Sequence, residues 1–241
     1  MNSKHQKGFS IVELMVALVA GLLLLTGVIQ VFVTNKQTYR VAEANARIQE
    51  NARFSMEALG RYLRVSGYRS DASQDMATAF PALTVFGYSF NSGEVIRGGD
   101  HEVVVRYQGG GTVRDCEDNS IVAAGTTVTT RVYREGNELK CSTNVDSSGS
   151  TPLLSDMDDM VVLYGVDTNN DRTANQYVPA NQVSDWSQVV SVRINLLLRS
   201  AENNIATAPQ TYTFNGTTTT PSDRYLRHTY TTTIALRNAL P

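Results

Sequence analysis

Three oxygen-bearing side chains, Asp167, Asn169 and Asp171, follow the D-x-N-x-D spacing with which a calcium-binding loop begins. Short carboxylate and amide side chains at alternate positions can converge on one hard cation. The pattern then departs from an EF-hand, because Arg172 stands where the loop needs glycine and Val178 stands where it needs glutamate. The stretch therefore predicts either a weak Ca²⁺ site or, as we favour, a solvated Asx turn without a metal.

Enzymatic chemistry finds little support in the other residues. Beyond the first ten residues the chain has two histidines, His101 and His228, and the His101-Glu102 pair lacks the second histidine of a zinc protease motif. Both histidines are more simply strand-face residues. The glycines at 109–111 precede no helical pattern, so they predict a flexible connection rather than a phosphate loop. We therefore expect no catalytic residue, no enzymatic activity and no cofactor other than the weak Ca²⁺ site.

An apolar run extends from Phe9 to about Val33, and Glu13 is its only charged residue. As an α-helix, residues 9–33 would be about 37 Å long, enough to cross a bilayer with some tilt. A carboxylate inside such a helix costs roughly 2.5–3.5 kcal/mol on insertion scales. Glu13 therefore needs a cationic partner, unless it lies at the level of the headgroups, where water solvates it.

Residues 7–14, Lys-Gly-Phe-Ser-Ile-Val-Glu-Leu, follow a short basic leader and resemble the N-terminus of type IV prepilins. The resemblance implies that prepilin peptidase removes residues 1–8 by cutting between Gly8 and Phe9, and then methylates the new amino terminus. It also implies that Glu13 pairs with the N-terminal ammonium of a neighbouring subunit. A cleaved secretory signal would need a small-residue site after the apolar run, where no convincing one occurs, and a plain signal anchor would not explain the Gly-Phe junction.

The two cysteines, Cys116 and Cys141, lie in polar, strand-rich sequence after the apolar run. Basic residues precede that run, so the positive-inside rule places the C-terminal domain in the periplasm, where a disulfide can persist. We predict a Cys116–Cys141 disulfide that closes a loop of about 26 residues and contributes roughly 3–4 kcal/mol; two free thiols are the alternative. The net charge of −2 at pH 7 indicates no basic surface for nucleic acid.

Helical periodicity continues beyond the apolar run. Residues 34–63 contain no proline and one glycine, Gly60, and small or apolar residues recur at three- and four-residue spacing. These are Val41, Ala44, Ile48, Ala52, Ser55, Leu59 and Tyr62. We predict one helix over residues 9–65, ended by Ser66-Gly67, whose second half packs its stripe on a domain.

The pattern changes to period two after Gly67 and predicts antiparallel strands. The expected strands cover residues 82–90, 102–107, 127–134, 160–166, 189–199 and 228–236. A hairpin turn is expected at 135–138, exposed loops at 144–151 and 215–222, and a solvated acidic turn at Asp156, Asp158 and Asp159. The fold class is therefore α+β, with a long N-terminal α-helix, transmembrane in its first half, packed on an antiparallel β-sheet domain.

Five segments resemble the PilW-type minor pilins: Asp115-Cys116 and residues 139–141, 160–167, 186–194 and 234–238. The resemblance implies a pilin-like fold made of a leader (1–8), a transmembrane half-helix (9–33), an amphipathic half-helix (34–66) and a β-rich periplasmic domain (67–241). It implies a minor pilin that helps to start assembly of a type IV pilus near the fibre tip.

The partners implied by the resemblance are prepilin peptidase, other minor pilins, the major pilin, the inner-membrane assembly platform, a tip adhesin and, before assembly, membrane lipid. The protein would cross the bacterial inner membrane once and later lie in the fibre at the cell surface. Two alternatives stay open. One is a minor pseudopilin of type II secretion, which has the same N-terminus, and the other is a membrane-anchored adhesin or binding module.

Overall fold

Helix α1 (Ile11–Arg64) runs through two compact units of the computed structural model, Met1–Ala44 and Asn45–Pro241. The structure describes residues 8–111, 114–116, 121–145 and 149–238, so residues 1–7 of the predicted leader lie outside the described residues. The helix begins two residues after the predicted start at Phe9 and ends one residue before the predicted end. Gly67 stops it, as predicted, because its φ of +76° is one that favours glycine.

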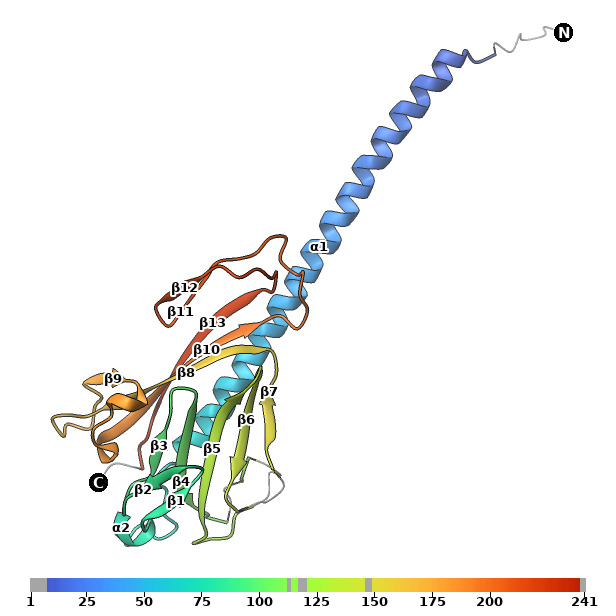
Figure 1. Cartoon of the computed structure of the whole chain (residues 1–241). Helices are drawn as coiled ribbons and strands as arrows, with labels where there is room; N and C mark the ends of the chain where they lie inside the picture. The colour runs from blue at the N-terminus through green and yellow to red at the C-terminus, as the bar shows by residue number, and fades with distance from the viewer. Residues whose placement is uncertain (1–7, 112–113, 117–120, 146–148, 239–241) are drawn as a thin grey trace. The chain divides into compact units, whose positions relative to one another are not determined.

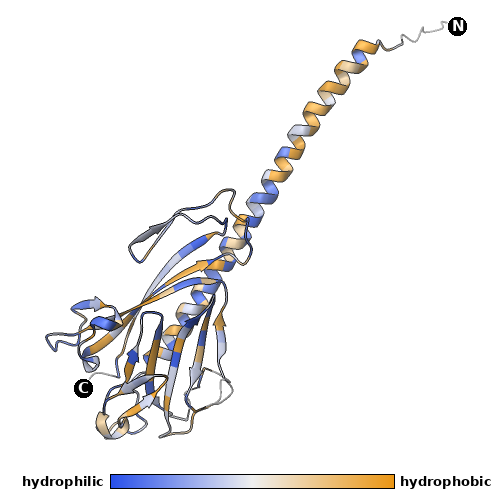
Figure 2. Cartoon of the chain, in the orientation of Figure 1, coloured by the Kyte–Doolittle hydropathy of each residue, from blue (hydrophilic) through white to orange (hydrophobic). Residues whose placement is uncertain are grey.

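The first unit contains the apolar part of α1, which Figure 2 colours as mostly hydrophobic. Its large apolar side chains are exposed. Among the described residues this is the one helix that is long and apolar enough to cross a membrane. The Thr26 hydroxyl has its hydrogen-bond partner within the helix: Thr26 Oγ1 donates to the Leu22 carbonyl oxygen at 2.9 Å. Such an internal bond lets a threonine lie in lipid without an unpaired polar group.

Two antiparallel sheets form most of the second unit (Figure 1). The five-stranded sheet has the order β3-β4-β5-β6-β7, with β3 at Ile96–Gly98, β4 at Glu102–Gln108, β5 at Thr127–Glu135, β6 at Glu138–Thr143 and β7 at Thr151–Leu154. The four-stranded sheet has the order β13-β10-β8-β9, with β8 at Met157–Val166, β9 at Gln176–Val178, β10 at Val189–Arg199 and β13 at Arg227–Ala235. The predicted α+β class is therefore confirmed.

Short elements complete the second unit. They are α2 (Met76–Ala79), the hairpin of β1 (Leu83–Val85) and β2 (Tyr88–Phe90), the hairpin of β11 (Tyr212–Phe214) and β12 (Thr217–Thr219), and the 3₁₀ turns η1 (Ala180–Gln182) and η2 (Trp186–Gln188). The predicted strand at 82–90 is wrong as one strand, because Phe86 and Gly87 have φ of +52° and +80° and turn the chain back on itself. Residues 215–222 are exposed as predicted except for the half-buried Pro221, but part of them forms β12 rather than loop.

The second half of α1 buries one stripe of side chains against the sheets. Ile48, Ala52, Ser55 and Leu59 are buried, as their spacing predicts, and Leu63 joins them in place of the half-buried Tyr62. Each large apolar side chain that is fully buried stabilises the fold by about 1.5–3 kcal/mol. Where the helix ends, the Gly67 amide donates to the carbonyl oxygen of Arg106 on β4 at 2.9 Å.

Tyr164 on β8 joins the two sheets. Its hydroxyl lies 3.0 Å from the Gly99 carbonyl oxygen and 2.9 Å from that of Glu102, next to the turn between β3 and β4. The close approach of Tyr164 to this turn requires glycine at position 98, because a Cβ added there would collide with the Tyr164 hydroxyl. The sheets are thus held together by a buried hydroxyl as well as by apolar packing.

The acidic residues expected to form a solvated turn have another role. Asp158 and Asp159 lie on β8, and Asp156 alone occupies the turn before it, with a φ of +61°. Asp158 pairs with Arg199 on β10 at 3.1 Å and also with Arg227 on β13. The prediction is wrong for Asp158 and Asp159 because arginines distant in the sequence compensate charges that look unpaired locally.

Candidate functional site

The segment Gly8-Phe9-Ser10 leads into α1 and is open on all sides. The Ser10 hydroxyl accepts a hydrogen bond from the Val12 amide (3.3 Å), and the Leu14 amide donates to the Ser10 carbonyl oxygen (3.1 Å), which makes Ser10 a helix cap. A Cβ added to Gly8 would meet no atom within 4 Å. Among the described residues, no contact therefore excludes a larger side chain at position 8.

Glu13 lies in the first turn of α1 and is exposed, and Phe9 is 84% exposed. Helix N-termini carry a partial positive charge, which favours a carboxylate in the first turn. The ammonium predicted to pair with Glu13 belongs to another subunit, so this pairing stays a prediction. The structure shows only that both Glu13 and Phe9 are exposed.

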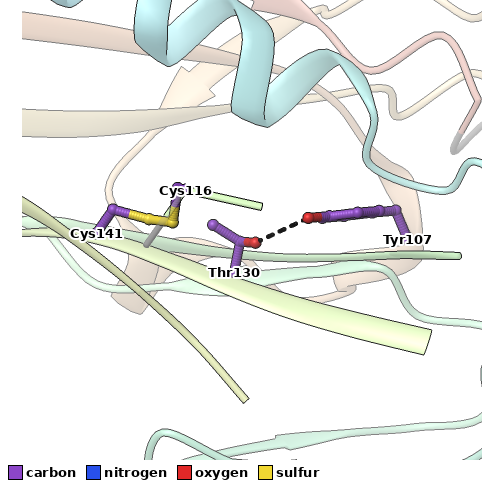
Figure 3. Close-up of a disulfide and its surroundings, with 4 residues drawn as sticks. All are labelled: Tyr107, Cys116, Thr130 and Cys141. Carbon is purple, nitrogen blue, oxygen red and sulfur yellow. Dashed lines mark hydrogen bonds between the residues drawn. A yellow bond between two sulfur atoms is a disulfide. The ribbon is translucent and has the colours of Figure 1, made fainter. Parts of the chain in front are cut away.

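The predicted Cys116–Cys141 disulfide is formed in the second unit, with the two Cα atoms 6.2 Å apart. Cys141 lies on β6 opposite Val132 of β5, and both cysteines are buried. Figure 3 shows the disulfide beside Thr130, whose hydroxyl donates to that of Tyr107 at 3.4 Å. The bond fixes the segment before β5 to β6, the strand between β5 and β7 of the five-stranded sheet.

The side chains of the D-x-N-x-D stretch are brought together, but they bind backbone amides. The Asp167 carboxylate accepts from the amides of Asn169 (3.1 Å), Asp171 (3.3 Å) and Arg172 (2.7 Å). Hydrogen bonds from the Thr173 side chain lower the pKa of Asp171 below its ordinary value. These bonds define an Asx turn and occupy oxygens that a cation would need, and no group of three or more acidic, histidine or cysteine side chains in the described part of the chain could hold a metal. The weak Ca²⁺ site stays a prediction.

A pocket of about 480 Å³ lies beside this turn. The Trp186 ring forms part of its wall, packed edge-on against Tyr164 with the ring centroids 4.7 Å apart. Its buried carboxylates are already bound, since Glu94 pairs with Arg97 at 2.6 Å and Asp167 belongs to the Asx turn. The pocket lining is mixed, with polar residues such as Asn170, Arg172 and Gln188 beside Trp186 and the apolar residues Ile96 and Val190. Sequence reasoning missed it, and Trp186, the single tryptophan, was the available signal.

The two histidines lie in separate environments. His101, in the turn before β4 rather than on a strand, contacts the Met160 carbonyl oxygen and lies 3.5 Å from Asp159. His228 on β13 bonds to the Asn45 side chain of α1 at 2.8 Å. Neither histidine has a nucleophile in these contacts, and the Asp159 carboxylate beside His101 belongs to no group of three or more possible metal ligands among the described residues.

Comparison with known families gives two matches. Residues 3–29 match the prokaryotic N-terminal methylation motif, and residues 121–238 match the family described as type IV pilus-assembly protein W. The first match contains Gly8, Phe9 and Glu13, and the second contains Cys141 and every strand from β5 to β13.

Comparison with individual proteins adds little. No curated protein matches the chain significantly. Among solved structures, a type IV-like pilin from Thermus thermophilus is similar, with 14% identity, a TM-score of 0.48, and coverage of 81% of this chain and 99% of the other. This similarity is too low to inform function.

Proposed function

We propose that this chain is a PilW-type minor pilin of the type IV pilus, which helps to start pilus assembly and lies near the fibre tip. One observation carries the proposal: a segment that matches an assembly-protein family follows an apolar run, residues 9–33, whose single charged residue is Glu13. In lipid the helix holds the subunit in the membrane, and in a fibre the same surface packs on neighbouring helices. The matched family is one of pilus-assembly proteins, not of known enzymes.

The membrane-anchored subunit would present its domain to the periplasm. The basic leader before the helix supports this orientation, because positively charged flanks stay in the cytoplasm. The disulfide also supports it, since disulfides persist outside the reducing cytoplasm. Prepilin peptidase, acting at the cytoplasmic face, would then reach the exposed Gly8-Phe9 junction.

Glu13 would set the axial position of the subunit during assembly. After cleavage the Phe9 ammonium of one subunit lies at the start of a helix, and Glu13 of a neighbour lies one turn along its own helix. Two opposite charges that pair within a low-dielectric helix bundle favour one register, because an unpaired charge there is costly. The partners implied are the other minor pilins, the major pilin, the inner-membrane assembly platform and a tip adhesin.

Complementation of a deletion strain tests the proposal. The wild-type gene should restore surface pili, and Glu13→Ala should insert into the membrane but fail to restore them. Glu50→Ala is the matched control, because Glu50 is an exposed residue of the same helix that forms only a local ion pair with Arg53 (2.7 Å). Normal piliation of the deletion strain would refute the assembly role, and normal piliation with Glu13→Ala would refute the role of the charge.

A further inference from the structure

The outer strands of the two main sheets differ in how well they are protected against pairing with another chain. Natural edge strands are usually kept short, charged or interrupted by proline. β3, β7 and β9 have three, four and three residues, and β7 contains Pro152. β13 has nine residues and contains no proline, lysine or acidic residue. Figure 1 shows β13, in red, as the outer strand of its sheet, with β10 as its neighbour.

The register of β13 shows which of its backbone groups are open. The Leu236 amide donates to the Val190 carbonyl oxygen (2.9 Å), and the Ser200 amide donates to that of Leu226 (2.8 Å). Because successive residues of an antiparallel strand face opposite edges, the even-numbered residues bond to β10 and the odd-numbered ones face outward. Thr231, Thr233 and Ala235 therefore direct their amide and carbonyl groups away from the sheet.

The β11–β12 hairpin covers only the beginning of this edge. Thr229 donates through its hydroxyl to the Thr213 carbonyl oxygen of β11 at 3.4 Å. Further along, the side chains of Thr231, Thr233 and Ala235 are exposed, and the described strands include no partner on that side. The open edge is thus residues 231–235, with small neutral side chains that do not repel an approaching strand.

The direction of β13 limits what can pair with it. Near its start His228 bonds to Asn45, and just after its end Asn238 Nδ2 donates to the Arg64 carbonyl oxygen at 3.1 Å. β13 therefore runs in the same direction as the second half of α1. Two copies related by a twofold axis would pair their β13 strands antiparallel and point the Asn45 ends of their helices in opposite directions. Subunits anchored in one membrane have the Asn45 ends of their helices on the same side. A twofold pair of copies through β13 is therefore incompatible with anchoring in one membrane.

We propose that the open edge of β13 is a strand-addition site that takes an extended segment of a different pilus subunit, running antiparallel to β13. The proposal rests on the assembly role proposed above. Antiparallel pairing is the more stable arrangement per residue. In strand addition the main-chain hydrogen bonds give the affinity, and the side chains of the incoming strand give the specificity. The site would thereby determine which subunit lies beside this one and their relative axial position in the fibre.

Two substitutions at Thr233 separate strand addition from side-chain effects. Thr233→Pro removes an outward amide, which β10 does not use, and places a ring at the edge. Thr233→Val removes the same hydroxyl, which accepts a weak bond from Arg193 (3.4 Å), but keeps the amide. We expect both full-length variants to melt close to the wild type in detergent. In complexes isolated from a piliated strain, the proline variant should be recovered at about one tenth of the wild-type yield or less, and the valine variant at the wild-type yield.

Amide hydrogen exchange supplies a readout that a merely structural role would not give. In the complex, exchange should slow at Thr231, Thr233 and Ala235 relative to the isolated chain, whereas Thr232 and Ile234 should be protected in both states. A complex without this added alternating protection would overturn the strand-addition site and leave the assembly role intact. Failure of the wild-type chain to form any complex would instead refute the assembly role itself. Photo-cross-links from Thr231 only to a second copy would overturn the choice of partner.

Discussion

Loss of the disulfide should destabilise the second unit by a predictable amount. Replacing both Cys116 and Cys141 with alanine opens a loop whose ends are 25 residues apart. The chain-entropy relation then gives a loss of about 3.5 kcal/mol at 25 °C. The packing change adds to this loss, because both sulfur atoms are removed from a buried site. With a denaturant slope of about 2.5 kcal/mol per molar of urea, the midpoint should fall by roughly 1.4 M.

Fluorescence of Trp186 is a suitable probe for this measurement. It is the single tryptophan, it packs on Tyr164 of one sheet, and the Arg97 guanidinium carbon of the other sheet lies 5.4 Å from its ring centroid. Urea titrations of the full-length wild type and the double variant in detergent give the two midpoints. A reductant should lower the wild-type midpoint and leave that of the variant unchanged. A midpoint shift below about 0.4 M, or a response of the variant to reductant, would refute the loop-closure argument.

Three further outcomes are expected. Intact-mass analysis of the membrane-extracted protein should give a chain that starts at N-methylated Phe9, and a bulky residue in place of Gly8 should block this processing; a product that starts beyond the apolar run would contradict it. A Ca²⁺ site would give heat in calorimetry and a higher melting temperature at millimolar Ca²⁺, both lost in Asp167→Asn, but the existing Asx turn leads us to expect neither. Arg227 lowers the pKa of Asp223 through hydrogen bonds of 2.6 and 2.8 Å. The wild type should therefore be more stable than Asp223→Asn, fully so above about pH 4, and this difference should vanish as the pH falls through the lowered pKa. Melting curves of both proteins as a function of pH measure it.

Long periodic segments carried most of the information that the sequence held about the fold. The stripe from Ile48 to Leu59 predicts a helix with one buried face, and the structure buries that face. The strands that became β4, β5, β8, β10 and β13 are also long, and their predicted ends differ from the observed ones by three residues or fewer. Short elements were missed because β3, β9 and β12 have three residues each, too few to show a period.

The remaining errors have a common physical cause, which is that partners distant in the sequence decide the outcome. Asp158 was expected in water because nothing near it is basic, yet Arg199 and Arg227 approach it from two other strands. Phe86 takes a positive φ that only the following glycine hints at. The disulfide was predictable because two cysteines allow one pairing. The open edge of β13 was not, because it depends on the order of strands in a sheet.

The hydrogen bonds between α1 and the end of the chain also affect the order in which the protein can fold. Asn45 bonds to His228 across 183 positions, and Arg64 bonds to Asn238 across 174. A chain is made from its N-terminus, so α1 is synthesised first and the strand that lies along it is synthesised last. The helix must therefore stay incompletely covered until nearly the whole domain has been synthesised. Shortening the chain before β13 would expose both β10 and the helix face, so even a small C-terminal truncation should yield an anchored but unfolded domain.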